Sequence, residues 1–244
     1  MHRSELTGRA DLHMHTTVSD GLATVQQVLE RICQRGDLDV IAITDHDRLE
    51  GSLWAYAHRN QYPFEIVPGV EVSSADGHVL ALWVTKPIPK DLSLAETAAA
   101  IHEQGGLAIV AHPFELIVTG KMVRRYLTHP EVLIQSGIDA VEIINAGAVT
   151  PGNNWLARRT FGKLGLALTG SSDAHLPESI GSAVTRFKGT TAADLRESLA
   201  LGCTAAEGKS WPITTYLKLL PIEIHRRRKK SSAANPRSVR QTLP

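Results

Sequence analysis

Short apolar runs alternate with amphipathic segments over about residues 9 to 205, and no other feature constrains the fold of this chain more. The runs have the length of strands, whereas the segments between them have helical spacing. Strand, helix and strand repeated along one chain favour a largely parallel sheet, either open and doubly wound or closed into a barrel. We therefore expect an α/β fold.

The expected elements follow from this alternation. Strands are predicted over Ala10–His13, Asp39–Thr44, Glu65–Val72, His78–Val84, Leu107–Ala111, Ala140–Asn145, Leu166–Gly170 and Ser182–Phe187. Helices are predicted over Thr24–Arg35, Ser93–Gln104, Val123–Ser136, Gly152–Leu164 and Thr191–Ala200. The Asp76–Gly77 pair between two apolar runs predicts a hairpin. Glu71 and His78 would share a face if the loop has an even number of residues.

Length and charge indicate one domain followed by a basic tail. The chain has 244 residues, 43% of them apolar and 21% charged, which is typical of a soluble globular protein. Residues 1–208 are predicted to form the domain. Residues 209–244 carry nine Lys or Arg against one acid, and we expect this tail to be disordered. The alternatives are a polyanion-binding arm and a membrane-surface segment led by Trp211, Tyr216 and Leu217.

Several classes of protein fit the composition poorly. The two cysteines, Cys33 and Cys203, have no zinc-type spacing and predict no disulfide framework. No stretch of about 18 apolar residues occurs, so we expect no transmembrane segment and a cytoplasmic location. Aromatic residues make up 5%, which disfavours a platform for stacking single-stranded bases. Nucleic acid bound through the basic tail is an alternative that the composition does not favour.

Histidines and carboxylates stand at the ends of five apolar segments. Two imidazoles that are two residues apart in an extended segment point the same way and can share an ion. The carboxyl ends of parallel strands are also where α/β folds build their sites. The residues are His13, His15 and Asp20; Asp45, His46 and Asp47; Glu71 with His78; His112; and Asp173 with His175.

Three of these clusters, taken alone, have a structural explanation. The two histidines of His13–Met14–His15 could be hydrogen-bonded at a strand end, Asp45 could cap a helix, and Glu71 could face water. Five such clusters at one edge are harder to explain as packing, since buried titratable groups are costly unless paired or bound to cations. Imidazole and carboxylate ligands without thiolates suit Zn, Mn or Fe. The ligand number favours two or three ions, with Glu71 as a bridge.

The motifs DLHMHTTVSDG, TDHD, PGVE, GHVLAL, AHP and SSDAH resemble, in order, those of the PHP (polymerase and histidinol phosphatase) domain, over about residues 10 to 187. The resemblance implies a distorted (β/α)7 TIM-like barrel and a metal-dependent phosphoesterase with a usually trinuclear site. The ligands it implies are His13, His15, Asp20, His46, Glu71, His78, His112, Asp173 and His175. One ion would lie among His13, His15, Glu71 and Asp173, a second among Glu71, His78 and His112, and a third among Asp20, His46 and His175.

The resemblance further implies hydrolysis of a phosphate ester by hydroxide on metal held by His13, His15, Glu71 and Asp173. We expect a phosphomonoesterase acting on a small phosphorylated metabolite or nucleotide. No Ser or Cys has a convincing nucleophile setting, so no phosphoenzyme is expected. The alternatives are a metal-dependent nuclease or phosphodiesterase acting on oligonucleotide ends, and a non-enzymatic metal-binding scaffold.

Substrate contacts are expected from the loops that follow the strands. Asn145, at the end of the run VEIIN, is the preferred contact, and Arg158 and Arg48 are the other two. A guanidinium can hold a phosphate through two parallel hydrogen bonds. The alternative for the arginines is an ordinary solvated face.

Overall fold

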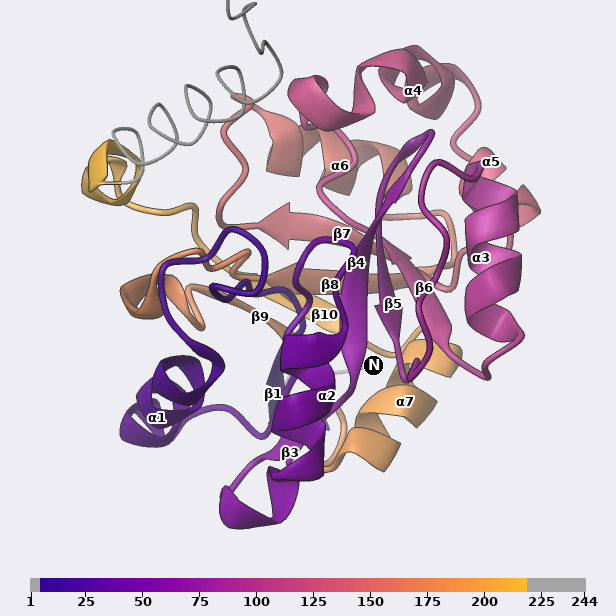
Figure 1. The fold of residues 1–244 in the computed structure, drawn as a ribbon. Coiled ribbons are helices and arrows are strands. Elements are labelled where there is room, and N and C mark those ends of the chain that lie inside the picture. The colour runs from indigo at the N-terminus through magenta and orange to yellow at the C-terminus, as the bar shows by residue number, and fades with distance from the viewer. Residues whose placement is uncertain (1–4, 219–244) are drawn as a thin grey trace, which may run out of the picture. The chain divides into compact units, whose positions relative to one another are not determined.

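The structure is a computed structural model that describes residues 5–218, and its strands form two five-stranded sheets (Figure 1). The first sheet has the order β10–β9–β1–β2–β3, with β1 at Gly8–Asp11, β2 at Val40–Ile41, β3 at Glu65–Ile66, β9 at Ala183–Phe187 and β10 at Ala205–Gly208. The second has the order β4–β5–β6–β7–β8, with β4 at Gly69–Ser74, β5 at Gly77–Leu82, β6 at Leu107–Val110, β7 at Ala140–Asn145 and β8 at Ala167–Ser171.

Strand direction is mixed in both sheets. The β1–β2–β3 and β6–β7–β8 sets are parallel, as predicted, whereas β4, β5 and β6 pair antiparallel and so do β1, β9 and β10. Two isolated bridges, Met14 with Ala174 and His46 with Glu71, join the sheets where the predicted ligands lie. The described residues up to 210 thus form a mixed α/β fold of two sheets, without one continuous closed barrel.

The chain crosses from the first sheet to the second at Pro68, so the single strand predicted over Glu65–Val72 is wrong. Val67 N–H donates to the Ile41 carbonyl in the first sheet, whereas Gly69 N–H donates to Ser52 Oγ at 2.8 Å. Pro68 has no N–H with which to continue a ladder. The crossing places Glu71 in the second sheet, beside the end of β2.

The helices lie at α1 Val25–Arg35, α2 Glu50–Ala57, α3 Leu94–His102, α4 Leu116–Thr128, α5 Val132–Gln135, α6 Asn153–Phe161 and α7 Ala192–Ala200, with 3₁₀ turns at Arg59–Gln61 and Pro177–Ser179. Capping boxes at Thr24, Ser93 and Thr191 begin α1, α3 and α7 at the predicted places. Two predictions were wrong: α2 was missed, and the helix expected over Val123–Ser136 is the pair α4 and α5. Pro130 lies between them and cannot continue a helix.

One hydrophobic cluster holds the two sheets together. Its buried members include Ala10 and Val40 from the first sheet and Leu80, Ile109 and Ala140 from the second. A separate cluster packs α1 against the first sheet through residues such as Leu29 and Ile41. Within residues 5–218, no helix has the length and apolar character needed to cross a membrane.

The chain divides into two compact units after Ser210. The predicted basic tail, 209–244, lies outside the described residues from 219 onward.

Candidate metal centre

All nine residues predicted as ligands gather where the ends of the two sheets meet. His13 and His15 follow β1, His46 follows β2 and His112 follows β6, while Asp173 and His175 follow β8. The hairpin is as predicted: Glu71 pairs with Leu80 and Ser73 with His78, so Glu71 and His78 share a face. The nine residues form four overlapping groups, in each of which the donor atoms lie within 4.8 Å of one another.

Glu71 lies at the middle of these groups and is fully buried. Its Oε2 is 3.3 Å from the Nε2 atoms of His13 and His15 and 2.9 Å from His46 Nδ1. Its Oε1 is 2.8 Å from His78 Nδ1 and 3.1 Å from His112 Nε2. One carboxylate therefore faces five imidazoles and can bridge cations on its two sides.

Asp173 forms a second wall of the centre. Its Oδ1 lies 3.4 Å from His13 Nε2 and 3.2 Å from His15 Nε2. Asp173 and His112 both have positive φ, 51° and 27°, which is uncommon for residues other than glycine. Such conformations persist where the surrounding structure enforces them, and they concentrate at functional sites.

The remaining group, formed by His15, Asp20, His46 and His175, is the side of the centre that water reaches. Asp20 Oδ2 is 3.3 Å from His175 Nε2 and 3.8 Å from His46 Nε2. The side chain of Asp20 is 35% exposed and that of His46 is 28% exposed, whereas His13 is completely buried. A ligand entering from solvent would meet this group first.

The imidazoles and carboxylates shift one another's pKa values. Burial opposes charge on His46 and His175, but Glu71 beside His46 and Asp20 beside His175 outweigh it and raise both pKa values to about 9. Burial likewise opposes charge on Glu71, yet His46, His13 and His78 hold the pKa of that carboxyl well below its usual range. In the absence of a cation, protons on His46 and His175 therefore offset part of the carboxylate charge.

The buried nitrogen and oxygen atoms of the centre are better suited to coordinating a cation than to hydrogen bonding with one another. His13 Nε2, His15 Nε2 and Glu71 Oε2 are buried and have no hydrogen-bond partner of acceptable geometry among the residues described. Buried polar atoms without partners are costly, whereas a cation would satisfy several of them at once. Nitrogen and oxygen donors without thiolates suit Zn, Mn or Fe. The residues present therefore fit a site for divalent cations.

Glu142 supports this centre and was missed as a functional residue by the sequence analysis. It is fully buried in β7, with Oε1 3.3 Å from His13 Nδ1. Its Oε2 accepts hydrogen bonds from His112 N–H at 3.0 Å and from Asn145 Nδ2 at 2.8 Å. A carboxylate behind an imidazole selects the tautomer and orientation of a ligand histidine. The sequence does contain a signal for Glu142, because this acid lies inside the apolar run AVEIIN, just as Glu71 lies inside an apolar run.

Asp45 anchors the loop that carries Asp20. Its Oδ1 accepts from Thr16 N–H at 2.7 Å and from Ser19 N–H at 3.2 Å, and its Oδ2 accepts from the Thr16 hydroxyl at 2.7 Å. The alternative that Asp45 caps a helix is wrong, because the N-cap of α2 is Leu49.

Asp11 and Asp47 also hold loops around the centre. Asp11 accepts from the N–H groups of Ser172 at 3.0 Å and Gly181 at 2.8 Å, and burial raises its pKa to about 6. Asp47 Oδ1 accepts from Ser73 N–H at 2.8 Å. These residues position the loops of the centre rather than face its donor atoms.

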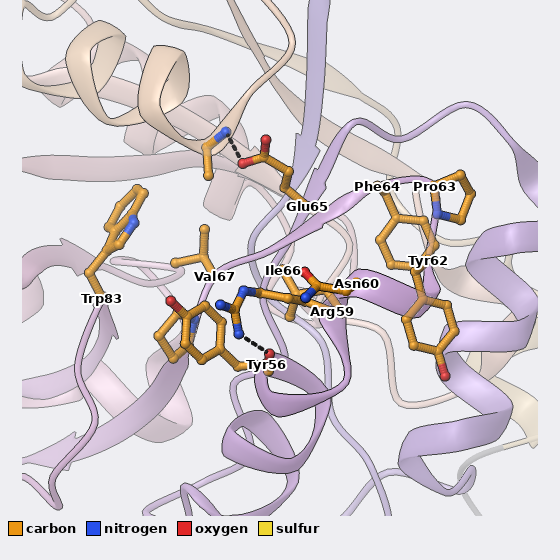
Figure 2. Close-up of a pocket in the computed structure, with 12 residues that line it drawn as sticks. Tyr56, Arg59, Asn60, Tyr62, Pro63, Phe64, Glu65, Ile66, Val67 and Trp83 are labelled. Carbon is orange, nitrogen blue, oxygen red and sulfur yellow. Dashed lines mark hydrogen bonds between the residues drawn. The ribbon is translucent and has the colours of Figure 1, made fainter.

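The three residues predicted to contact substrate lie in different surroundings. Asn145 is buried and its Nδ2 donates to Asp173 Oδ2 at 3.1 Å. The guanidinium of Arg48 pairs with Glu50 at 2.9 Å, and Arg158 lines a separate cavity beside α6. Another cavity, of about 490 Å³, lies among Tyr56, Arg59, Val67 and Trp83 and contains none of the nine predicted ligands (Figure 2).

Two family descriptions match the chain. Residues 11–130 match the PHP domain, and residues 151–204 match the PHP-associated segment. Together these ranges contain every residue predicted as a ligand.

Relatives agree with the family match. The uncharacterized protein MJ1587 of Methanocaldococcus jannaschii is 31% identical over 149 residues, which are 57% of this chain and 82% of that protein. A phosphoribosyl 1,2-cyclic phosphate 1,2-diphosphodiesterase of Eggerthella lenta is 39% identical over 85 residues, 32% of each chain. A 3′,5′-nucleoside bisphosphate phosphatase of Chromobacterium violaceum is 29% identical over 150 residues, 57% of this chain and 50% of that enzyme.

A solved structure has the same fold. It is a two-domain protein from Bacteroides vulgatus described as containing a predicted PHP-like metal-dependent phosphoesterase, with a TM-score of 0.68 at 19% identity. The match covers 82% of this chain and 64% of that one.

Proposed function

The chain belongs to the PHP domain family of metal-dependent phosphoesterases, and we propose that it hydrolyses a phosphate monoester of a small phosphorylated metabolite or nucleotide. The observation that carries the proposal is the environment of Glu71, a buried carboxylate with five imidazole nitrogens within 3.3 Å. The nucleoside bisphosphate phosphatase among the relatives supports a monoester substrate. Because the match spans only half of that enzyme, the proposal does not extend to its particular substrate.

We propose that the nine predicted ligands hold two or three divalent ions, with Zn, Mn and Fe as candidates, and that Glu71 bridges two of them. Divalent ions supply Lewis acidity and lower the pKa of coordinated water. We further propose that the two sheets correspond to a distorted (β/α)7 barrel. Residues 1–208 would form the catalytic domain, and residues 209–244 would be a tail appended to it. A cytoplasmic location stays a prediction.

The protein's own side chains would prepare the centre for an incoming phosphate. Glu142 fixes His13 with Nε2 directed at Glu71 and Asp173, and Asn145 Nδ2 steadies Asp173. The phosphate would enter at the partly exposed group around Asp20, His46 and His175. Of the predicted substrate contacts, Asn145 is the best placed, while Arg48 and Arg158 stay predictions. A reaction without a phosphoenzyme stays a prediction.

The test is a hydrolysis assay of the full chain with Mn, Zn or Fe on phosphorylated metabolites, mononucleotides and short oligonucleotides. We expect metal-dependent release of phosphate from a monoester. Asp173→Ala should reduce turnover by more than about 100-fold. Replacing a residue that only hydrogen bonds to a metal ligand typically lowers metal affinity or activity by about 10–100-fold, and loss of a ligand itself should lower activity further. Glu103→Ala, a change of an exposed acid on the protein surface, serves as the control.

Two other outcomes would each replace the proposal. Degradation of oligonucleotides without turnover of any monoester would identify a nuclease. Full metal occupancy without hydrolysis of any phosphoester would identify a metal-binding scaffold.

A further inference from the structure

A basic groove runs along α6, apart from the groups that form the metal centre. It is a cavity of about 740 Å³ lined by Trp155, Arg158, Arg159 and Lys163 over an apolar floor that includes Ile143 and Leu168. We refer to these residues as the α6 groove. No residue of the metal centre lines it.

The charge of the α6 groove has one sign. Arg158, Arg159 and Lys163 lie within six residues, and none of them pairs with an acid in the part of the chain that the structure describes. No acid lines the cavity, and Glu207 of the neighbouring β10 pairs with Arg9 instead. Three adjacent cations without counter-charges attract a polyanion.

Trp155 adds a flat apolar surface beside these cations. Its side chain is 64% exposed, which is unusual for so large an apolar group, and the Arg159 guanidinium lies 5.7 Å from the ring centre. Trp155 also lines a second cavity, of about 320 Å³, together with Leu127 and Leu156. An exposed aromatic ring among cations is how proteins stack the bases of single-stranded nucleic acids while holding their phosphates.

The first turn of α6 is hydrogen bonded to Asn145, which supports the metal centre. Asn145 N–H donates to Asn154 Oδ1, and Asn154 Nδ2 donates to the Asn145 carbonyl, both at 2.9 Å. Asn145 in turn hydrogen bonds to Asp173. Trp155 follows Asn154 directly, so the α6 groove begins next to the residues that support the centre.

We propose that the α6 groove binds a single-stranded polynucleotide, with a base stacked on Trp155 and phosphates at Arg158, Arg159 and Lys163. A single strand fits better than a duplex because only unpaired bases can leave their stack to reach an aromatic ring. This goes beyond the proposed monoesterase activity, since the groove would hold the strand whether or not the centre hydrolyses it.

The test is binding of a fluorescein-labelled oligo-dT of about twelve nucleotides to the full chain, by fluorescence anisotropy in EDTA. Chelation prevents hydrolysis, so the result does not depend on the proposed function. Arg158→Glu with Arg159→Glu should raise Kd about tenfold or more and make its salt dependence shallower. Trp155→Ala should raise Kd roughly fivefold or more through lost stacking.

The matched control reverses two arginines of the basic tail, Arg227→Glu with Arg228→Glu. An equal loss in this control would assign binding to the tail and overturn the proposal. Undetectable binding of oligo-dT by the unaltered chain would also overturn the proposal. A third contradicting result is that inorganic polyphosphate competes as well as unlabelled oligo-dT and that Trp155→Ala leaves Kd unchanged. Circular dichroism verifies folding, and Arg158→Lys with Arg159→Lys should retain most of the affinity.

Discussion

Two kinds of carboxylate, all buried or largely buried, surround the centre. Glu71 and Asp173 each face at least two ligand imidazoles, whereas Glu142, Asp45 and Asp11 accept hydrogen bonds from backbone N–H groups, and Glu142 also lies behind the single imidazole of His13. The first kind has an oxygen, Glu71 Oε2, without a hydrogen-bond partner among the described residues, while the second kind is well satisfied. A cation would therefore satisfy the first kind, while the second kind holds the loops and the ligand side chains in place.

Replacing Glu142 by Gln should weaken metal binding by about 10–100-fold while the fold is retained, because the His13 imidazole loses the carboxylate behind it. An amide matches the shape of the carboxylate but cannot accept at both of its ends. Isothermal titration with Mn or Zn measures the affinity. Glu131→Gln, at a half-exposed side chain between α4 and α5, is the control, and an unchanged affinity in Glu142→Gln would refute the positioning role.

At this scale the sequence predicted the donors but not their supports. His13, Glu71 and Asp173 stand out because each is a polar residue within or just after an apolar run. The contact of Glu142 with His13 spans 129 positions and that of Asp45 with Thr16 spans 29. Nothing local to either acid specifies such a partner, so these roles required the fold.

Among the elements, the loop from Thr16 to Asp20 depends on β2 for its shape. Asp45, just past β2, accepts three hydrogen bonds from Thr16 and Ser19, and a fourth from the Ser19 hydroxyl at 2.6 Å. Asp20 follows Ser19 directly and faces His175 and His46. The position of Asp20 is therefore set by a strand end some 25 residues further along the chain.

Asp45→Ala should free this loop and selectively reduce metal occupancy at the group that contains Asp20. The buried group of His13, His15 and Glu71 should keep its metal, because the Asp45 carboxylate bonds to Thr16 and Ser19 and not to these three residues. Elemental analysis of protein dialysed against limiting Mn would show a lower metal-to-protein ratio. Asp37→Ala, on the surface after α1, should leave the ratio unchanged; loss of all metal from Asp45→Ala would show that the groups are not separable.

Elements with a strong local signal were predictable, and those decided by tertiary contacts were not. The strand over Ala140–Asn145 has its predicted bounds, and α1, α3 and α7 begin at recognisable capping residues. The apolar residues of α2 do not gather on one face, so periodicity could not reveal it. The chain changes sheets at Pro68 because Val67 hydrogen bonds to Ile41 and Gly69 to Ser52. The sequence of residues 65–72 does not specify these partners.

At the scale of the whole molecule, the centre lies at the junction of two sheets and concentrates charge there. Alternating strands and helices predicted an α/β fold, and Asp76–Gly77 predicted the β4–β5 hairpin, but neither could predict that β5 runs against β6 and β9 against β1, because strand direction follows from connections around the whole fold. The junction brings histidines from both sheets to the carboxylates of Glu71 and Asp173. The stability of the whole fold should therefore depend on the charge state of this cluster.

The metal-free protein should lose stability as pH rises from about 6.5 to about 9. His46 and His175 have an ordinary pKa of 6.5 that the folded state raises to about 9. A pKa raised by folding gives stability that is fully present below 6.5 and lost as pH passes 9. The carboxylates with lowered pKa are ionised throughout this range, and Asp11, with a pKa of about 6, is largely ionised at its lower end.

Thermal unfolding in EDTA at a series of pH values would measure this effect as a falling Tm. Bound metal should reverse the trend, because its ligands must be neutral imidazoles and a higher pH removes the competing protons. The gain in Tm on adding Mn should therefore grow between pH 6.5 and 9. His46→Gln should flatten the metal-free profile, whereas His129→Gln, on the exposed surface before α5, should leave it unchanged. A metal-free Tm that rises over this range would contradict the charge balance inferred for the centre.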